Sequence, residues 1–462
     1  MRELEPLYTA DEMRAAEQGH SVETLMERAG SEAAQVAMHL FIRAQRWTVV
    51  CGGGANGGDG RIAARHLAEA GKDVRIVDAK AGETDLGEPD AILDALFGTG
   101  FAGTPRPDAA ALIERMNASP ARVLALDLPS GVDASTGEVA GPAVQADATV
   151  TFHARKVGLV VAPGRFHAGT VHVADIGLEP RDTEHKLVRV HLLRSVPRRR
   201  EGQNKYTAGH VLVVGGSRGL TGAPSLSSLA AMRSDAGYVT LAAPESTLPA
   251  FEQRLVEEVK RPLPERDGVV TADAADAVLE LAKKASAVAI GPGLGRGDGP
   301  KELVRRLLAE LELPVVVDAD ALHDLEPGDW PGPRVLTPHE GELGRLLGRE
   351  SKEIAAHRLA SAREAADRFR CVVVLKGADS IVAAPGRSVL VSALGLPSLA
   401  TAGTGDVLTG IVGAFLAKGM EPQLAAAAAC AAQQRASVEA PQRVGLVASD
   451  LIDALPRALG NV

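Results

Sequence analysis

The sequence is poor in cysteine and in aromatic residues. Its 462 residues include only three cysteines, Cys51, Cys371 and Cys430, together with 8 Phe, 3 Tyr and 2 Trp. The odd cysteine count and the lack of metal-type spacing argue against a disulfide framework, so we expect reduced, buried thiols in a cytoplasmic protein. Few aromatic residues beside abundant Ala, Val and Leu favour helices packed on parallel strands over an all-β sandwich.

Long apolar runs and an excess of basic charge are also missing. No apolar run approaches the length of a membrane span, and the first residues contain no apolar signal core, so we expect no membrane association. The formal net charge of -9 argues against broad contact with nucleic acid or an anionic membrane. Hydrophobic residues at 45% predict well-formed cores. The length suggests two or three domains.

The first half alternates expected helices and strands. Apolar and small residues recur at helical spacing from Thr9 to about Leu40, with Thr9 and Asp11 as possible caps, and the segment Arg61–Ala70 predicts another helix. Short strands are expected at Trp47–Cys51, Val74–Asp78, Ala91–Asp94, Val123–Asp127 and Thr149–Phe152. This alternation predicts a doubly wound parallel sheet.

A glycine-rich loop at residues 52–60 follows the first of these strands. Gly52, Gly54 and Gly57 fit the G-x-G-x-x-G pattern of a dinucleotide-binding turn. Asp78 lies about where that pattern places the acid that binds a ribose. An NAD-dependent oxidoreductase is therefore one interpretation of this half.

Three carboxylates argue for a different ligand. Asp59 lies in the glycine loop, and Asp94 and Asp127 lie at the carboxyl ends of expected strands, the edge where such sheets bind ligands. Together they would repel a pyrophosphate. A cation held by the hard oxygen atoms of Asn56, Asp94 and Ser130 would relieve that repulsion. Taken singly, each residue could equally be a cap or a turn residue.

Three linked motifs, at residues 54–60, 94–100 and 126–133, resemble the signatures of the NAD(P)H-hydrate epimerases. The resemblance covers about residues 8–178 and implies a Rossmann-like epimerase domain over residues 1–190. It implies a potassium ion held by Asn56, Asp94 and Ser130, and it implies that Asp127 contacts the hydrated nicotinamide. Epimerisation requires reversible loss and return of a ring hydroxyl with the help of an acid-base group, for which Asp127 is the catalytic candidate.

The same resemblance implies a set of substrate-binding residues, part of which holds the substrate phosphate. With Asp127, the set comprises Ala55, Asn56, Gly57, Gly58, Asp59, Gly98, Thr99, Gly100, Phe101, Ala102, Gly103 and Thr104. Ala55 departs from the family pattern, which usually has Asn at this position. The departure removes a possible side-chain contact to the ligand.

Residues 191–203 are expected to link two domains. The segment contains the basic cluster Pro197–Arg200. Because the chain is acidic, we interpret this cluster as a solvated linker and not as a nucleic-acid site. A second domain is then expected over residues 204–462.

The second half repeats the order of strand, glycine loop and helix with different motifs. The strand His210–Val214 precedes a loop that extends to Pro224 and a helix of small residues that ends at about Ala236. Further strands are expected at Val239–Ala242, Ala287–Ile290, Pro314–Asp318, Arg334–Thr337 and Val372–Lys376. Glycine-rich or polar segments follow these strands, and all would open on one edge of a sheet.

The turn Thr401–Asp406 combines an anion site with a carboxylate. Gly403 and Gly405 let a ligand approach the backbone, and the helix expected at Val407–Leu416 would offer unpaired N–H groups and the positive end of its dipole. Asp406 would repel a phosphate unless it removes a proton or holds a metal. An ordinary helix cap is the alternative.

The order of five motifs from about Asn204 to Leu459 resembles the ribokinase-like NAD(P)H-hydrate dehydratases. The resemblance implies an α/β/α domain in which Asp406 is the catalytic base. It implies nucleotide binding by Lys376, Gly377, Ala378, Asp379, Ser380 and Gly405, and substrate binding by Ala223, Gly293, His339 and Asp406. The segment Cys430–Arg435 departs from relatives that often carry a His-Gly pair there.

The two resemblances together imply a metabolite-repair enzyme with two active sites. One would interconvert the R and S hydrates of NADH and NADPH, and the other would dehydrate the S form with ADP and Mg²⁺, releasing AMP and phosphate; the fusion favours ADP over ATP. The second fold alone would also allow a vitamin or sugar kinase with a ligand-sensing or assembly module. Because relatives assemble, we expect a homo-oligomer in the cytoplasm, with small molecules as its partners.

Overall fold

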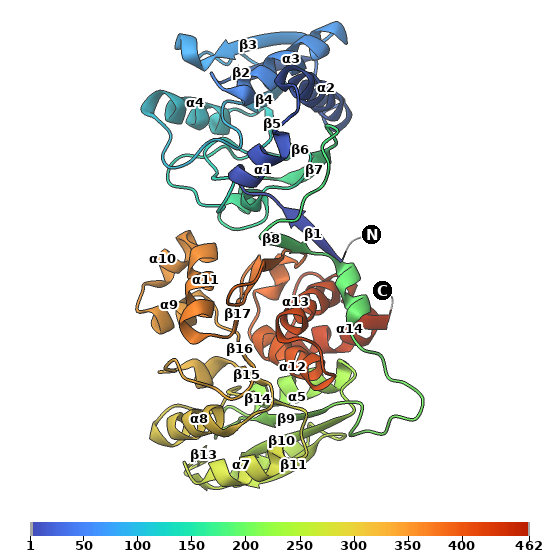
Figure 1. Ribbon diagram of the computed structural model, residues 1–462, viewed down its shortest axis with the longest axis vertical. Coiled ribbons are helices and arrows are strands. Elements are labelled where there is room, and N and C mark those ends of the chain that lie inside the picture. The colour runs from blue at the N-terminus through green and yellow to red at the C-terminus, as the bar shows by residue number, and fades with distance from the viewer. Residues whose placement is uncertain (1–2, 461–462) are drawn as a thin grey trace. The chain divides into compact units, whose positions relative to one another are not determined.

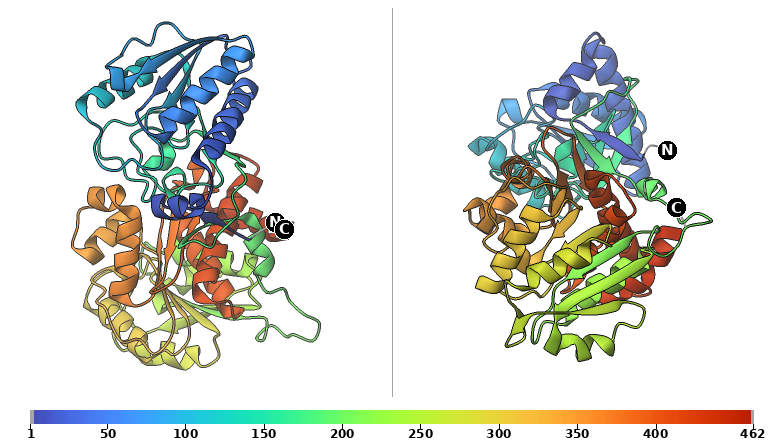
Figure 2. Two further views of the ribbon diagram at one scale, coloured as in Figure 1. Left: turned by 45° about the horizontal axis from the view of Figure 1, so that its top comes forward. Right: turned by 60° about the horizontal axis from the view of Figure 1, so that its bottom comes forward.

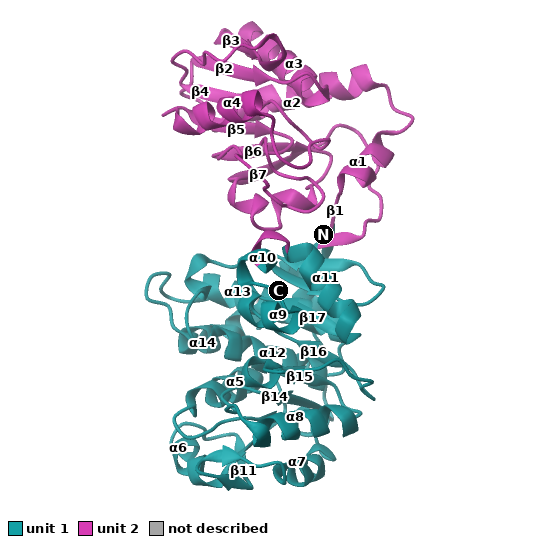
Figure 3. Cartoon of the chain, turned by 90° about the vertical axis from the view of Figure 1, so that its left-hand side faces the viewer, with its two compact units in different colours: residues 1–5, 187–354, 358–462 teal, residues 6–186, 355–357 magenta. Residues whose placement is uncertain are grey.

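The computed structural model describes residues 3–460, which form two compact units (Figures 1 and 3). The first unit in chain order comprises residues 6–186 and 355–357, drawn in magenta as unit 2 in Figure 3, and the second comprises the remaining described residues, drawn in teal as unit 1 there. All three cysteines are free and buried, as the sequence predicted. Across residues 3–460, no helix has the length and apolar character that crossing a membrane requires.

The first unit is built on a parallel sheet with the strand order β3-β2-β4-β5-β6-β7. The strands are β2 (Arg46–Cys51), β3 (Asp73–Asp78), β4 (Ala91–Ala95), β5 (Arg122–Leu126), β6 (Ala148–Phe152) and β7 (Thr170–Ala174). The first five confirm the strands expected from the sequence. The edge strand β7 was not predicted, because it is largely exposed and lacks a continuous apolar run.

Helices cover both faces of this sheet, which confirms the doubly wound architecture. Side chains alternate along β2, so Val49 and Cys51 join one core while Val50 joins the other. The first core contains α1 (Ala10–Glu17), α2 (Val22–Leu40) and α3 (Ala55–Glu69), and the second contains α4 (Pro107–Ala118). Thr9 caps α1 through a reciprocal bond with Glu12, and Ser21 caps α2.

The order of the strands creates a crevice between β2 and β4. β3 lies on one side of β2, and the chain then crosses to place β4 on the other side. The segments that follow β2 and β4 therefore diverge at the carboxyl edge, where sheets of this kind bind ligands. These segments, residues 52–54 and 96–104, include much of the predicted binding set.

The helix after the glycine segment begins earlier than the sequence predicted. We expected Arg61–Ala70, but α3 begins at Ala55, with Gly54 as an extended N-cap (φ -96°, ψ -169°). Residues 55–59 are therefore the first turns of a helix and not a loop. Glycine is a poor helix former, which explains the error, and close packing overrides that propensity here.

The second unit is built on a sheet with the order β1-β8-β19-β18-β17-β16-β15-β14-β9-β10-β11. The strands from β17 to β11 are parallel, and β17, β18 and β19 pair antiparallel. Their bounds are β1 (Leu4–Leu7), β8 (His185–Val188), β9 (His210–Val214), β10 (Tyr238–Pro244), β11 (Val259–Leu263), β14 (Ala287–Ile290), β15 (Val315–Val317), β16 (Arg334–Leu336), β17 (Val372–Leu375), β18 (Ser380–Ala383) and β19 (Val389–Ser392). A separate hairpin joins β12 (Glu265–Arg266) and β13 (Val269–Val270).

Helices lie on both faces of this sheet as well. Figure 2 shows its strands between helices coloured red and helices coloured yellow. The helices are α5 (Gly222–Arg233), α6 (Leu248–Glu252), α7 (Ala274–Ala282), α8 (Asp298–Glu310), α9 (Glu340–Leu347), α10 (Ser351–Ala356), α11 (Arg358–Phe369), α12 (Thr404–Ala417), α13 (Pro422–Glu439) and α14 (Ala448–Gly460). Residues of α5, α12, α13 and α14 share one core with Val211 and Val213 of β9. This confirms the predicted α/β/α layers.

The six strands expected in this half are confirmed, and two helix starts are corrected. α12 begins at Thr404, three residues before the expected Val407, and α5 begins at Gly222, inside the expected loop. The antiparallel pair β18 and β19 was not predicted, because no helix separates these strands from β17 or from each other. The strand order also reverses between β9 and β14, the kind of position at which such sheets bind ligands.

The first residues of the predicted linker, residues 191–203, belong to a short helix. Val190–Ser195 form a 3-10 helix in which Leu192 and Leu193 are buried in the core of the second unit. Beyond it, Arg199 pairs with Asp235 at 2.7 Å. The first part of this segment is thus packed onto the second unit.

The glycine at the start of α3 is required by close backbone packing. A Cβ atom at Gly57 would lie 2.0 Å from the carbonyl oxygen of Gly52, whereas a Cβ atom at Gly54 would meet nothing within 4 Å. Gly57→Ala should therefore lower the free energy of unfolding of the first unit by about 1–3 kcal/mol, the usual cost of overpacking.

Urea denaturation measures this loss, and Gly54→Ala is the matched control with an expected change near zero. Equal stability of the two variants would contradict the packing argument.

Candidate active sites

A cavity of about 950 Å³ opens at the carboxyl edge of the first sheet. Asp127 and Lys156 line it together with the glycine segment and the loop after β4. The predicted substrate residues that line it are Ala55, Asn56, Asp59, Gly98, Thr99, Gly100, Phe101, Ala102, Thr104 and Asp127. The other three, Gly57, Gly58 and Gly103, do not line it.

The carboxylate of Asp127 accepts hydrogen bonds on both oxygen atoms. Oδ1 lies 2.7 Å from Lys156 Nζ and accepts from Thr151 Oγ1 at 3.2 Å. Oδ2 accepts from the backbone N–H of Thr99 at 2.9 Å and also from its hydroxyl. Burial opposes ionisation, but Lys156 and Thr99 together hold the pKa of Asp127 below its usual range. Asp127 is therefore a fixed negative charge.

Lys156 is the partner that the sequence analysis missed. It is 1% exposed, and besides Asp127 its ammonium donates to Thr151 Oγ1 at 3.0 Å and to the carbonyl of Phe152 at 2.8 Å. Its three N–H groups thus have three protein acceptors. The available signal was a lysine directly before the apolar run 157–162.

Asp59 also lies at this cavity, on the second turn of α3. It is 9% exposed, and among residues 3–460 its carboxyl has no hydrogen bond or ion pair. Burial, reinforced by the charges of Asp127 and Glu17 and opposed by Lys156, raises the pKa of Asp59 to about 8. Two carboxyls of one cavity thus differ in protonation state at neutral pH.

The structure brings Asn56, Asp94 and Ser130 together below this cavity. Ser130 donates to Asp94 through its hydroxyl at 2.6 Å and its backbone N–H at 2.8 Å, and Asn56 Nδ2 donates to the carbonyl of Phe97 at 2.8 Å. Burial, only partly offset by the bonds from Ser130, raises the pKa of Asp94 to about 6. Asn56 Oδ1 is buried without a hydrogen-bond partner in the described chain.

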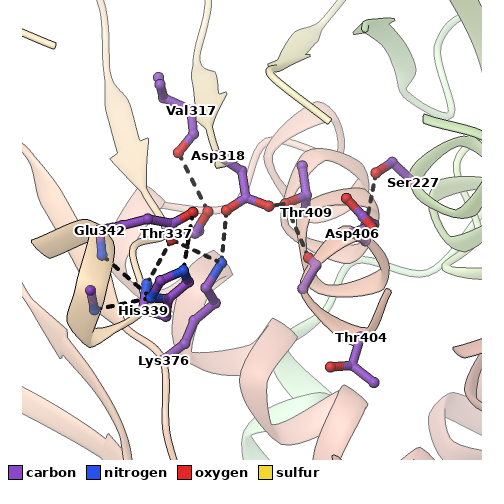
Figure 4. A network of polar contacts seen from close by, with 12 residues as sticks. Ser227, Val317, Asp318, Thr337, His339, Glu342, Lys376, Thr404, Asp406 and Thr409 are labelled. Carbon is purple, nitrogen blue, oxygen red and sulfur yellow. Dashed lines mark hydrogen bonds and ion pairs between the residues drawn. The ribbon is translucent and has the colours of Figure 1, made fainter. Parts of the chain in front are cut away.

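A second group of polar residues gathers at the carboxyl edge of the second sheet. Figure 4 shows Asp318, directly after β15, between Lys376 and Thr409. Lys376 Nζ lies 2.8 Å from Asp318 Oδ1, and Thr409 Oγ1 donates to Oδ2 at 2.7 Å. Although burial opposes both charges, the pair lowers the pKa of Asp318 and raises that of Lys376. Sequence analysis placed Asp318 at a strand end but assigned it no role.

Asp406 lies on the first turn of α12, beside this ion pair. Gly403, the N-cap residue, has φ 88° and leaves the first N–H groups without a side-chain cap. A Cβ atom at Gly405 would lie 3.4 Å from Lys376 Nζ, so the turn borders the lysine. Burial and the charge of Asp318, opposed by Lys376, raise the pKa of Asp406 to about 7.

His339 is both a helix cap and an accessible side chain of this group. Its Nδ1 accepts from the N–H of Gly341 at 3.0 Å and of Glu342 at 3.3 Å, and Glu342 Oε2 accepts from the N–H of His339 at 2.9 Å. Because Nδ1 accepts, the proton of the neutral ring lies on Nε2. The side chain is 56% exposed and available to a ligand. Glu342 also lies 3.8 Å from Lys376 Nζ.

Two further predicted residues lie in the segments that follow β9 and β14, where the strand order reverses. Ala223 is in the first turn of α5, and Gly293 follows β14 with φ 58°. The hydroxyl of Ser227 donates to the carbonyls of Ala223 at 3.3 Å and Asp406 at 2.9 Å, which connects α5 to the turn of Asp406. The predicted substrate residues Ala223 and Asp406 are thus linked through Ser227.

The predicted nucleotide loop, residues 376–380, is held by a buried arginine. Arg358 Nε lies 3.1 Å from Asp379 Oδ1, and its guanidinium donates to the carbonyls of Asp379 at 3.0 Å and Lys376 at 3.4 Å. The ion pair of Asp379 with Arg358 therefore holds the loop in its conformation. Ala378 lies in the loop, and Ser380 is the first residue of β18. Arg358, which the sequence analysis did not select, had no motif to mark it.

The segment that lacks the His-Gly pair reaches the start of α12. Gln433 donates its amide to the carbonyl of Thr404, and Gln434 bonds to Ser392. Gln433 thus supplies a contact between α13 and the turn that carries Asp406.

Two family models match the chain. The model described as NAD(P)H-hydrate dehydratase matches residues 211–457. The model described as YjeF-related protein N-terminus matches residues 22–86 and 77–158. Each candidate site lies largely within one of these matches.

Relatives with both parts match nearly the whole chain. The bifunctional NAD(P)H-hydrate repair enzyme of Moorella thermoacetica is 38% identical over 490 residues, which cover 95% of this chain and 92% of that protein. The enzyme of the same name from Salinibacter ruber is 37% identical over 528 residues, covering 98% of this chain and 96% of that protein.

A solved structure matches the second unit. The ADP/ATP-dependent NAD(P)H-hydrate dehydratase of Bacillus subtilis, co-crystallised with ATP and Mg²⁺, has a TM-score of 0.53 and 33% identity to this chain. The match covers 58% of this chain and 95% of that one.

The ion pair between Asp318 and Lys376 should contribute strongly to stability. Lys376→Met would leave a carboxylate that is 2% exposed without its cation, which should lower the free energy of unfolding of the second unit by about 3 kcal/mol. The loss should shrink at acid pH, because protonation of Asp318 removes the unpaired charge.

Urea denaturation tests this, with the double variant Asp318→Asn/Lys376→Met as the control. The double variant should recover part of the lost stability; if it were less stable than Lys376→Met, the pairing argument would fail.

Proposed function

The chain belongs to the family of bifunctional NAD(P)H-hydrate repair enzymes, and we propose that it epimerises hydrated NADH and NADPH in its first unit and dehydrates the S epimer in its second. The observation that supports this most is the position of Asp406. Its carboxyl, with a pKa of about 7, lies beside Lys376 on a helix start without a side-chain cap. A phosphate can bind at this helix start while the carboxyl takes a proton from a substrate hydroxyl.

The dehydration begins with proton removal by Asp406. Asp406 takes the proton of the hydrate hydroxyl, and the oxygen attacks the terminal phosphoryl group of ADP, which releases AMP. The carbon–oxygen bond of the phosphate ester then breaks, phosphate leaves, and loss of a proton from the neighbouring ring carbon restores the dihydropyridine. Lys376 and the N–H groups at residues 403–405 stabilise the charge that develops on the phosphoryl group.

Other predicted residues position the two substrates. The loop of Lys376, Gly377, Ala378, Asp379 and Ser380, with Gly405, binds the nucleotide. Ala223, Gly293 and His339 bind the hydrate beside Asp406, with the exposed ring of His339 as the polar contact.

The charges around Lys376 also fit Mg²⁺. Asp318, Glu342 and Asp406 all act on Lys376 and help to raise its pKa, so one lysine faces three carboxyl groups. Mg²⁺ binds in proteins through one or two carboxylates and the phosphates of a nucleotide. We propose that Glu342 contributes to holding it, and when bound it would neutralise phosphate charge.

In the first unit, Asp127 contacts the hydrated nicotinamide ring. The substrate set at residues 55–59 and 98–104 binds the remainder of the hydrate, with its phosphate near the start of α3, where a helix dipole favours an anion. Ala55 offers no polar side chain to this ligand. Asp127 is one of the two catalytic residues that we propose.

Asn56, Asp94 and Ser130 fit a potassium ion. Asn56 Oδ1 has no partner in the described chain, and the Asp94 carboxylate is fully buried with hydroxyl and amide donors but no cation. A potassium ion would supply the missing positive charge and a partner for the orphaned oxygen. The ion would stabilise the buried Asp94 carboxylate and the structure beneath the cavity.

We further propose that residues 1–190 are the epimerase domain and residues 204–462 the dehydratase domain, joined by residues 191–203. ADP is the proposed donor, and the protein acts as a cytoplasmic homo-oligomer. A vitamin or sugar kinase, the alternative, would accumulate a stable phosphorylated product.

Repair of hydrated NADH is the test of this function. With ADP and a mixture of both epimers, the chain should restore the full absorbance of NADH. Asp406→Asn should lower this rate at least about 100-fold, because proton removal by a positioned base contributes 10²–10⁴-fold. The wild-type rate should rise with pH through about 7, as Asp406 loses its proton.

The same variant should still interconvert the R and S hydrates, measured by chromatography without ADP. Loss of both activities in a folded Asp406→Asn protein would contradict two separate sites. Repair of only half the mixture by the wild type would reduce the first unit to a binding module.

Potassium should stabilise the first unit measurably. If Asn56, Asp94 and Ser130 hold it, the midpoint of thermal unfolding should be higher in KCl than in NaCl of equal ionic strength, because a ligand of the folded state adds stability. Asp94→Asn should abolish the difference. An equal response of both proteins to the two salts would refute the assignment.

A further inference from the structure

We propose that Asp59 is the residue that transfers the proton in the epimerase reaction, while Asp127, held by Lys156, is the fixed negative charge that stabilises the cationic ring. This inference rests on the proposed function of the first unit. It divides between two carboxyl groups the roles that the sequence analysis assigned to Asp127 alone.

The first observation is that the two carboxyls share one cavity. Asp59 on α3, Asp127 after β5 and Lys156 after β6 all line the space of about 950 Å³. A hydrated ring held between the loops of β2 and β4 would therefore lie within reach of both. The cavity gives one substrate two different acidic neighbours.

The second observation is the saturation of Asp127. Lys156, the hydroxyl of Thr151 and both the N–H and the hydroxyl of Thr99 donate to its two oxygen atoms. Four donors stabilise the charged form and occupy the lone pairs that would accept a substrate proton. Such a carboxylate suits electrostatic stabilisation of a cation better than proton transfer.

The third observation is the isolation of Asp59. Its carboxyl is 9% exposed and has no hydrogen bond or ion pair within residues 3–460. The charged groups that act on it are Asp127, Glu17 and Lys156, and with burial they raise its pKa to about 8. At neutral pH Asp59 thus holds a proton, and a pair of carboxyls with separated pKa values is typical of an acid and its charged neighbour.

The reaction then balances with water as the only co-reactant. Asp59 donates its proton to the ring hydroxyl as the carbon–oxygen bond breaks, which releases water and leaves a positive charge on the ring nitrogen and carbon. Asp127 stabilises that cation. A water molecule adds to the opposite face of the carbon, and its proton returns to the Asp59 carboxylate through the water just released.

The test starts from one pure epimer without ADP and follows its conversion by chromatography. Asp59→Asn should lower kcat at least about 100-fold with little change in KM. Asp108→Asn, the same change at an exposed residue of the same cavity, should keep the wild-type rate. Urea denaturation of the first unit, unchanged from the wild type, checks that Asp59→Asn protein is folded, because ADP-dependent repair reports only on the second unit.

Isotope and pH measurements add independent readouts. In H₂¹⁸O, the wild type should place ¹⁸O on the ring carbon at each epimerisation, and Asp59→Asn should not. The wild-type rate should fall as pH rises through about 8, because Asp59 then loses its proton. In Asp127→Asn, the fall of the residual rate with rising pH should begin at a lower pH than in the wild type. The pKa of Asp59 should be lower there, because a negative neighbour is gone while Lys156 stays.

The outcomes distinguish a failure of the proposed epimerase function from a failure of the role assigned to Asp59. If the wild type fails to interconvert the epimers, the proposed function is wrong. If the wild type epimerises but Asp59→Asn keeps more than half of its kcat, or shows only a raised KM, Asp59 is a binding residue and the inference is overturned. A wild-type rate that does not fall above pH 8 would overturn it as well.

Discussion

A buried aspartate paired with a lysine is the interaction on which both sites depend. In the first unit Asp127 pairs with Lys156, and in the second Asp318 pairs with Lys376. Each aspartate directly follows a strand, and in each case a second carboxyl, which has no ion pair within residues 3–460, lies nearby on the early turns of a helix. The pair keeps one negative charge fixed, and that charge helps to raise the pKa of the second carboxyl, Asp59 or Asp406. Two different sheets thus arrive at the same electrostatic arrangement.

Much of the fold could be predicted because parallel strands buried on both faces form apolar runs. All eleven strands expected from the sequence are present, and the strand ends meet at one edge of each sheet. The edge strand β7 was not predicted, because its sequence lacks a continuous apolar run. The antiparallel strand β18 was not predicted, because no helix separates it from β17. The start of α3 was predicted too late for another reason, because tertiary packing at Gly57 outweighs the poor helix propensity of glycine.

The candidate sites were predicted where a motif carries the chemistry and missed where a partner lies far away in the chain. Asn56, Asp94 and Ser130 meet as expected, and so do Lys376 and Gly405. The partners Lys156 and Arg358 lack any local pattern, and only the folded chain shows what they contact. The protonation of Asp59 could not be predicted either, because it depends on burial and on charges from three other segments.

The contact between Arg358 and the nucleotide loop also constrains how this sequence can change. A Cβ atom at Gly377 would lie 2.4 Å from Arg358 Nη2. Arg358 is 3% exposed and its guanidinium is paired with Asp379 and Glu340, so it cannot move aside as a surface arginine would. Evolution can therefore place a side chain at position 377 only after position 358 has become smaller, and the two positions should drift as a coupled pair.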